Sequence, residues 1–380
     1  MGKLVSKIAD YLRECDKILM ILCLAACSYG CIAVMSATHY TGSLRQFLMQ
    51  ALCMCLGIAA VIIISNFDYR SLSRFWPVVA VITVVPVILT FFIGYAPGET
   101  DDKAWLYIFG VSFQPAELLK IGFAITFGLH LSRVGGEINK FKNVLLLCIH
   151  GAIPVMLIHM QGDDGTALVF LVMFIAMMFA AGLKLRYWIT AAVLIAMSLP
   201  VVYFVIMNDD QRSRIISMFN IEGDLLGAGW QQWRGRIALA NGGFFGRGLF
   251  NGPLTQVKDA IPEGYNDFIF TCIGEELGFL GCAAVVILLF SICLRILQIG
   301  KSTGDKFGYY ICVGVFGMLA AQTVINLGMC LSILPVIGVT LPFFSAGGTS
   351  LLCLFTGVGV VMSVYMHRTS LTPRLHDNNW

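Results

Sequence analysis

The sequence predicts an all-α membrane protein in which ten transmembrane helices form one domain over residues 1–380. Three observations carry this prediction. The chain is 58% hydrophobic and 12% charged, whereas soluble domains carry about 25% charged residues. The apolar residues come in runs of roughly 17–25, the length that crosses a hydrocarbon core of about 30 Å. Lysine and arginine gather in alternate loops between these runs, the asymmetry that sets the orientation of a membrane protein.

The predicted spans follow one another along the chain, mostly with short loops between them. The first run is long enough to stay in the membrane as a span, and it follows a short amphipathic stretch expected to lie on the inner leaflet. The eighth run is longer than a span requires, so one of its ends is expected to project or tilt. The spans lie near residues 18–37, 47–65, 75–95, 114–132, 143–160, 166–183, 188–207, 268–294, 307–331 and 347–366.

The distribution of basic residues predicts that both termini lie in the cytoplasm. With the N-terminus inside, the inner segments hold most of the lysines and arginines, and the short outer loops hold only Arg45 and Lys103. A large outer loop over residues 208–266 then joins the seventh and eighth helices. Helical spacing at Trp230 and Trp233 indicates a helix within this loop, with the tryptophans anchored at the headgroup level.

Composition and spacing exclude several classes of site. The net charge is +3 and no long basic run exists, so nucleic acid is not an expected partner. The 13 cysteines show neither a disulfide framework nor zinc-type spacing with histidines. The glycine-rich segment 242–248 lacks the Gly-Lys-Ser/Thr ending of a phosphate loop, which excludes a nucleotide site. No organic cofactor is expected.

Charged residues at the start of the fourth span form the first group that could carry chemistry. Pro115 suits the first turn of a helix. Glu117 and Lys120 are three residues apart and therefore share one helix face. They form either a self-neutralising buried pair or, together with Lys103 and Trp105 just upstream, a cationic contact for an anionic substrate.

A tight outer turn from Gln161 to Thr166 leads into the sixth span and contains Asp163. Asp163 can be the N-cap of that helix. Alternatively, it faces the same cavity as Lys120, pairing with this lysine or holding a divalent cation, Mg²⁺ or Mn²⁺.

Acidic residues mark the start of the eighth span. Asp267 lies where the long loop meets the helix, as either an N-cap or a general base whose pKa is raised by partial burial. Glu275 and Glu276 lie about two turns deeper, and two adjacent acids in a span require partners. The last span begins with a Pro- and Gly-rich segment around Ser345, for which close packing is the simplest interpretation.

In this order, the four groups resemble the motifs of the SEDS family of RodA, FtsW and SpoVE, and the resemblance covers essentially the whole chain. The matching residues are Trp105, Gln114-Pro115-Ala116-Glu117, Gln161 to Thr166, Pro262-Glu263, Asp267-Phe268-Ile269-Phe270 and Ser345-Ala346-Gly347-Gly348. The chain departs from the family pattern at Ala116, Gly162, Asp164, Tyr265, Asn266 and Ala346. Short termini and the loop at Phe67-Asp68-Tyr69 favour a RodA-like member.

The resemblance implies a peptidoglycan glycosyltransferase that polymerises lipid II in the bacterial cytoplasmic membrane, with a class B penicillin-binding protein as its transpeptidase partner. Asp267 matches the essential acid of the family and is assigned as the general base. The expected substrate-binding residues are Trp105, Lys103, Glu117, Lys120, Gln161, Asp163, Glu263 and Ser345. The rival interpretations are a lipid II flippase and a catalytically silent scaffold of a wall-synthesis complex.

Overall fold

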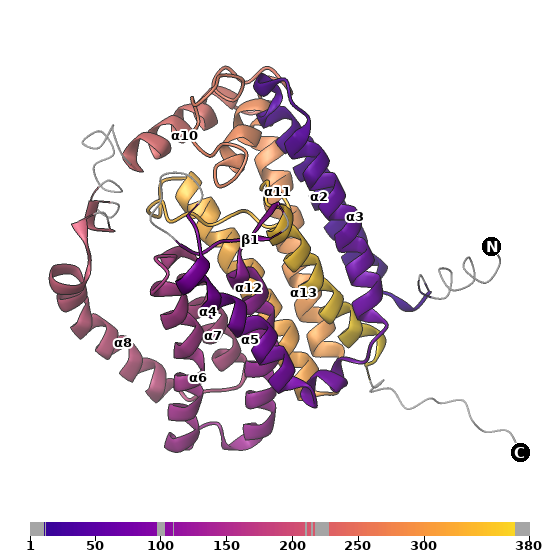
Figure 1. The fold of residues 1–380 in the computed structure, drawn as a ribbon, viewed down its shortest axis with the longest axis vertical. Helices are drawn as coiled ribbons and strands as arrows, with labels where there is room; N and C mark the ends of the chain where they lie inside the picture. The colour runs from indigo at the N-terminus through magenta and orange to yellow at the C-terminus, as the bar shows by residue number, and fades with distance from the viewer. Residues whose placement is uncertain are drawn as a thin grey trace, which may run out of the picture.

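The structure of the protein is a computed structural model, which we describe for residues 11–368 apart from residues 12, 97–102, 109, 210, 214–215 and 217–227. Within these residues the chain is a bundle of long helices (Figure 1). The predicted amphipathic stretch before the first span lies largely outside the described residues.

Each predicted span contains a helix. The helices are α2 (Lys17–Ala37), α3 (Arg45–Ser65), α4 (Trp76–Ile93), α5 (Pro115–Val134), α6 (Phe141–His159), α7 (Asp164–Ala180), α8 (Leu185–Val201), α11 (Ile269–Ser302), α12 (Lys306–Cys330) and α13 (Gly348–Met366). Within the described part of the chain, eight helices are long and apolar enough to cross a membrane. The exceptions among the ten are α7, which is shorter, and α5, which carries buried charged residues. The protein is therefore a multi-pass membrane protein.

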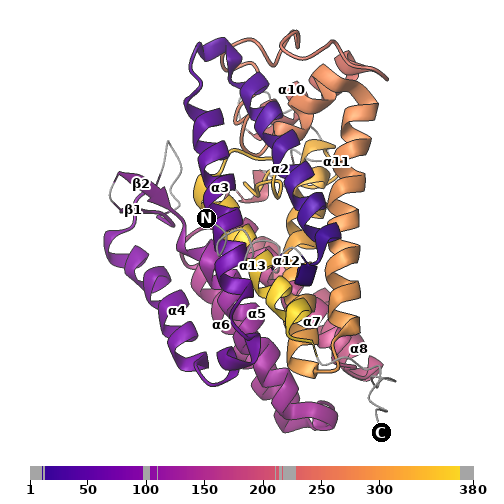
Figure 2. The same cartoon turned by 90° about the vertical axis from the view of Figure 1, so that its right-hand side faces the viewer.

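Short elements connect the helices. They are η1 (His39–Thr41), η2 (Tyr69–Ser73), η3 (Gly135–Glu137), the π-helical turn η4 (Val202–Ile206), the strands β1 (Leu106–Ile108) and β2 (Val111–Phe113), and α10 (Ala228–Gly242). The antiparallel β1–β2 hairpin between α4 and α5 was not expected from the sequence (Figure 2). Helix α10 confirms the predicted helix in the long loop, and α10 lies over one end of the bundle (Figure 1).

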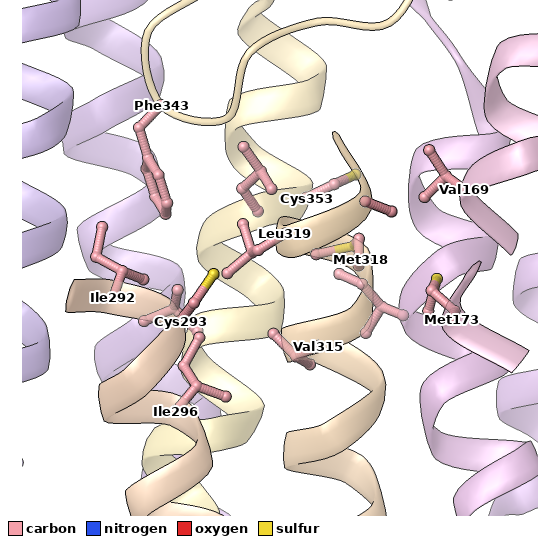
Figure 3. Close-up of a cluster of buried hydrophobic side chains, with 14 of the residues drawn as sticks. Val169, Met173, Ile292, Cys293, Ile296, Val315, Met318, Leu319, Phe343 and Cys353 are labelled. Carbon is pink, nitrogen blue, oxygen red and sulfur yellow. The ribbon is translucent and has the colours of Figure 1, made fainter. Parts of the chain in front are cut away.

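The core forms around α12, which packs along α5, α7 and α11. Small residues allow this close approach, since Gly314 of α12 lies against Ala124 of α5. Apolar side chains fill the remaining space, among them Met318 of α12, Cys293 of α11 and Met173 of α7 (Figure 3). On the other side of the bundle, α13 packs along α3.

Helix α8 stands apart from this core. None of its described side chains is buried, and Figure 1 shows it at the edge of the bundle. Its first residues are tethered to the turn before α6, where the backbone N–H of Lys184 donates to Asn139 at 2.8 Å. The apolar sides of α8 are therefore available to lipid.

Helix α11 is broken at Gly278, which explains the unusual length of the eighth run. Gly278 has φ 67° and ψ −162°, a conformation that favours glycine. A segment of the long loop satisfies the backbone groups freed by the break. The carbonyl of Glu275 accepts from Arg247 N–H at 3.0 Å, and Phe279 N–H donates to the carbonyl of Gly243 at 2.9 Å. The first two turns of α11 thus form a separate platform under the long loop.

Candidate active site

Asp267 lies just before α11, but it does not cap this helix. The N-cap residue is Phe268, which makes no side-chain capping bond, so the N-cap interpretation of Asp267 is wrong. The Asp267 side chain is half-buried, and among the described residues neither carboxylate oxygen accepts a hydrogen bond. The loop before α13 passes close to this carboxylate, since a Cβ on Gly338 would lie 3.7 Å from Oδ2. The carboxylate is therefore positioned by backbone geometry and left open to a ligand.

Asn326 of α12 fixes the backbone at this point. Its Nδ2 donates to the carbonyl of Asp267 at 2.7 Å and to the carbonyl of Val339 at 2.7 Å. Asn326 is fully buried, so both bonds are protected from water. One amide thus joins the start of α11 to the loop before α13.

Ser345 makes the second connection between the same two segments. Its hydroxyl donates to the carbonyl of Asn266 at 2.7 Å and accepts from Leu341 N–H at 2.7 Å. Ala346 N–H adds a bond to the carbonyl of Tyr265 at 2.9 Å. Ser345 therefore positions the residue before Asp267, and the predicted packing role of its segment is confirmed.

The environment of Asp267 favours its protonated form. Burial, followed by the negative charges of Glu263 and Asp163, raises the pKa of this carboxyl to about 7. A carboxyl with such a pKa exchanges its proton near neutral pH, as a general base must.

Asp163 reaches this site from the start of α7. It is the N-cap of α7, where Oδ1 accepts from Thr166 N–H at 2.8 Å, which confirms the predicted cap. Its Oδ2 accepts from Gln114 Nε2 at 2.7 Å, which links the starts of α7 and α5. Gly165 lets the loop before α13 come close, because a Cβ there would lie 2.2 Å from the carbonyl oxygen of Ile337.

Glu117 and Lys120 form the predicted self-neutralising pair. Lys120 Nζ lies 2.7 Å from Glu117 Oε1, and the two side chains are 1% and 5% exposed. The other carboxylate oxygen of Glu117 is buried and has no hydrogen-bond partner. Both side chains are therefore enclosed within the helix bundle. The alternative pairing of Lys120 with Asp163 is not formed.

Three further expected residues are not joined to Asp267 by a hydrogen bond or ion pair. Lys103 is exposed before the hairpin, and Trp105 pairs through its backbone with Tyr95. Gln161 is buried and donates from Nε2 to Thr90 and, at 3.0 Å, to the carbonyl of Val87. Its amide therefore joins the turn before α7 to α4.

Glu263 lies closer to Asp267 than these three. Its carboxylate accepts from Asn266 Nδ2 at 2.6 Å, and its backbone carbonyl accepts from Phe268 N–H at 3.1 Å. It has φ 49°, a conformation that non-glycine residues rarely adopt. Glu263 thus shapes the turn that presents Asp267.

The two deeper acids of α11 bind the long loop. Glu275 is fully buried and accepts from Thr255 N–H at 2.7 Å and Thr255 Oγ1 at 2.8 Å. Glu276 accepts from Gln256 Nε2 at 2.7 Å and from Ser36 of α2. The sequence indicated that these acids need partners, and except for Ser36 of α2 the partners named here lie in a loop without a motif of its own.

The described residues contain no group of three histidine, cysteine, aspartate or glutamate side chains that could hold a metal ion. Both oxygens of Asp163 already accept hydrogen bonds. Within the described part of the chain, a divalent cation could gain at most one or two carboxylate ligands, as is usual for Mg²⁺ bound together with substrate phosphates.

Comparison with known proteins gives consistent matches over nearly the whole chain. The model of the FtsW, RodA and SpoVE family, described as cell cycle protein, matches residues 17–370. The peptidoglycan glycosyltransferase MrdB of Escherichia coli is 29% identical, with 94% of this chain and 95% of MrdB covered. Stage V sporulation protein E of Bacillus subtilis is 32% identical, with 92% and 96% covered. The probable peptidoglycan glycosyltransferase FtsW of Trichlorobacter lovleyi is 30% identical, with 93% of each chain covered.

Solved structures share the fold. A chain from a peptidoglycan synthase complex, solved to show the structural coordination of polymerization and crosslinking, superposes with a TM-score of 0.81 at 25% identity, covering 92% of this chain and 97% of that one. The rod shape determining protein RodA of Thermus thermophilus gives a TM-score of 0.69 at 23% identity, covering 93% and 97%. These likenesses agree with the ordered motifs found in the sequence.

Proposed function

The chain belongs to the FtsW, RodA and SpoVE family of cell cycle proteins, and from this premise we propose that it is a peptidoglycan glycosyltransferase in which Asp267 is the general base. The names of its relatives support the activity. The observation that carries the role of Asp267 is its carboxylate, which has a pKa near 7 and accepts no hydrogen bond within the described residues. The proposed substrate is lipid II, which has an apolar tail, a pyrophosphate and a sugar–peptide head.

In the proposed reaction Asp267 removes the proton from a hydroxyl of the acceptor sugar. The hydroxyl oxygen attacks the anomeric carbon of the donor, and the bond from that carbon to the pyrophosphate oxygen breaks. Its electron pair leaves with the polyprenyl pyrophosphate. General-base catalysis contributes about 10²–10⁴-fold to such a step, so alignment of the two sugars and stabilisation of the leaving charge must supply the rest.

The eight expected substrate-binding residues divide into three groups by their contacts. Asp163 and Glu263 lie near Asp267 and act on the sugars or on the carboxylate itself, and Ser345 positions the turn that presents this carboxylate. Lys103 and Trp105 lie at the exposed hairpin, where the lysine can meet the pyrophosphate. The remaining three hold the surrounding helices in place, namely Glu117, Lys120 and Gln161.

We propose that a divalent cation, Mg²⁺ or Mn²⁺, binds only when the substrate is present. Asp163 is the carboxylate that would hold it, with phosphate oxygens and water as the other ligands. Bound there, the ion would neutralise the pyrophosphate. The hydrogen bonds that Asp163 accepts from Thr166 and Gln114 keep its carboxylate oriented whether or not a cation is bound.

We also propose ten transmembrane helices with both termini in the cytoplasm, in the bacterial cytoplasmic membrane. The ten helices and the distribution of basic residues support this arrangement. All of residues 1–380 then form one membrane domain, with residues 208–266 outside the cell. This orientation places Asp267 on the outer side, where the sugars of lipid II are joined.

A class B penicillin-binding protein is the proposed partner. The solved complex that shares the fold coordinates polymerization with crosslinking. A polymerase needs such a partner because crosslinking the new glycan requires a transpeptidase. The relatives include proteins of cell shape, division and sporulation, and the RodA-like assignment rests on the loop at Phe67-Asp68-Tyr69.

Incubation of the purified protein with lipid II, with and without a class B penicillin-binding protein, tests this function. A polymerase makes glycan chains longer than the disaccharide unit. A flippase moves lipid II across vesicle membranes but makes no polymer, and a scaffold does neither. Either of the last two results would contradict the proposal.

A further inference from the structure

A cavity of about 130 Å³ lies beside the segment that leads to Asp267. Its walls come from the end of α2, from η1 and from the long loop, and they include Tyr40, Asp259, Glu263 and Tyr265. We call this space the tyrosine cavity. Tyr265 is one of the positions at which the chain departs from the family motif.

The tyrosine cavity carries uncompensated negative charge. Asp259 and Glu263 both line it, and within the described residues neither forms an ion pair. Burial raises the pKa of the Tyr40 phenol, and the charge of Asp259 raises it further. Burial followed by the charge of Glu263 raises the pKa of Tyr265 in the same way. The two carboxylates therefore lie close enough to the phenols to make the cavity attractive to a cation.

The chemistry of the walls selects the kind of cation. Carboxylates with aromatic rings are the surroundings that ammonium groups prefer in proteins. A divalent metal ion is less suited, since the described residues offer two carboxylates here and form no three-ligand group. The cavity is also large enough for an ammonium group with its methylene stem.

We propose that the tyrosine cavity binds a primary ammonium group on the peptide branch of the peptidoglycan precursor and thereby positions its sugar at Asp267. This inference rests on the proposed glycosyltransferase function. Crosslinking of peptidoglycan consumes an amine of this branch, so the group is present and free while the glycan is polymerised. Recognition of the amine would select precursors that can later be crosslinked.

The wall of the cavity is continuous with the catalytic turn. The backbone carbonyl of Glu263 accepts from Asn266 N–H at 3.0 Å and from Phe268 N–H at 3.1 Å. A ligand held against Glu263 is therefore fixed to the same rigid turn that presents Asp267. This connection lets a contact with the peptide align the sugar.

Kinetics with two substrates test the proposal. The purified wild-type protein is given lipid II with its free peptide amine, or lipid II whose amine has been acetylated and is neutral. We expect acetylation to lower kcat/KM about tenfold, the effect of losing one charge-assisted contact. Equal use of both substrates would overturn the proposal. Absence of polymer from either substrate would instead contradict the proposed function.

The variant Asp259→Asn tests whether the effect of acetylation arises in the tyrosine cavity. Asp259→Asn removes the charge at an exposed position with φ 56°, a conformation that asparagine tolerates. We expect kcat/KM for free-amine lipid II to fall about tenfold, and acetylation to cause no further fall, because the charge and the amine act as a pair. Independent losses that multiply would overturn the proposal.

One further variant serves as a control, and another tests the aromatic wall of the cavity. Lys258→Gln changes the charge of the exposed neighbour of Asp259, and it should discriminate between the substrates as the wild type does. Tyr40→Leu removes an aromatic ring from the cavity and should weaken that discrimination. Full discrimination in a folded Tyr40→Leu protein, as shown by its thermal unfolding, would contradict the role of the aromatic walls.

Discussion

Asn326 of α12 donates a hydrogen bond to the backbone carbonyl of Asp267, in the turn before α11, at 2.7 Å. The same amide group donates to Val339 in the loop before α13. This buried side chain holds two loops in register around a carboxylate that has no hydrogen-bond partner of its own in the described structure. The reactive group is thus fixed through its main chain, which leaves its side chain free to exchange a proton.

Removal of the lysine from the buried ion pair should destabilise the protein. In Lys120→Met the carboxylate of Glu117 stays buried without a cation, which typically costs about 3–5 kcal/mol. We expect a clear drop in the temperature of thermal unfolding in detergent. The double variant Glu117→Gln/Lys120→Met, which buries no charge, should recover much of this loss. A single variant as stable as the wild type would show that the pair does not hold the helices together.

The pH dependence of polymerisation should report the charge next to Asp267. The general base works when ionised, so the rate should rise with pH through the pKa of about 7. Asp163→Asn removes a negative charge that raises this pKa, while asparagine remains a good N-cap for α7. The midpoint of the rate profile should therefore move to lower pH.

Asp164→Asn is the matched control for this shift. Asp164 is the next residue, but it pairs with His159 and is not among the charges that raise the pKa of Asp267. The pH midpoint of the polymerisation rate of Asp164→Asn should stay near that of the wild type. Equal shifts in both variants would contradict a specific effect of Asp163.

Loss of the Ser345 hydroxyl should lower turnover by misplacing the catalytic turn. Ser345→Ala leaves the carbonyl of Asn266 and the N–H of Leu341 without their partner, at a cost of about 1–3 kcal/mol each when buried. We expect kcat to fall about tenfold while KM and the pH midpoint stay constant, since Ser345 is a positioning residue. Ser350→Ala, in the first turn of α13, should be nearly silent. A changed pH midpoint in Ser345→Ala would contradict the positioning role.

The orientation in the membrane can be tested by labelling. In a cysteine-free background, single cysteines at Lys103 and Lys258 should react with an impermeant reagent in intact cells, whereas one at Lys301 should not. All three positions are exposed, so accessibility depends on the side of the membrane. Labelling at Lys301 would overturn the proposed N-in and C-in topology.

Features that depend on neighbouring residues were predictable from the sequence. The last span was placed at 347–366 and the helix is Gly348–Met366. The capping role of Asp163 and the pairing of Glu117 with Lys120 follow from spacings of three residues, so one sequence window contains each interaction.

Features that depend on distant contacts were not predictable. The contact of Asn326 with Asp267, and the binding of Glu275 to Thr255, join segments that no local period connects. The break at Gly278 was also missed, because a glycine within an apolar run is compatible with an unbroken helix until the loop segment that satisfies its backbone is known. An isolated asparagine in an apolar helix, such as Asn326, is a signal that could have been used.

The central claim is that the Asp267 carboxylate acts as a base, and glycan polymerisation by Asp267→Asn tests it most directly. Asparagine keeps the size of the side chain and the backbone bond to Asn326, and no capping bond is lost because Phe268 is the N-cap. An amide cannot take the proton at neutral pH. We would measure glycan chains formed from lipid II alongside thermal unfolding in the same detergent. The account predicts a stable protein whose polymerisation falls at least about a hundredfold, the low end of general-base catalysis. Near-normal polymer from a stable Asp267→Asn protein would contradict it.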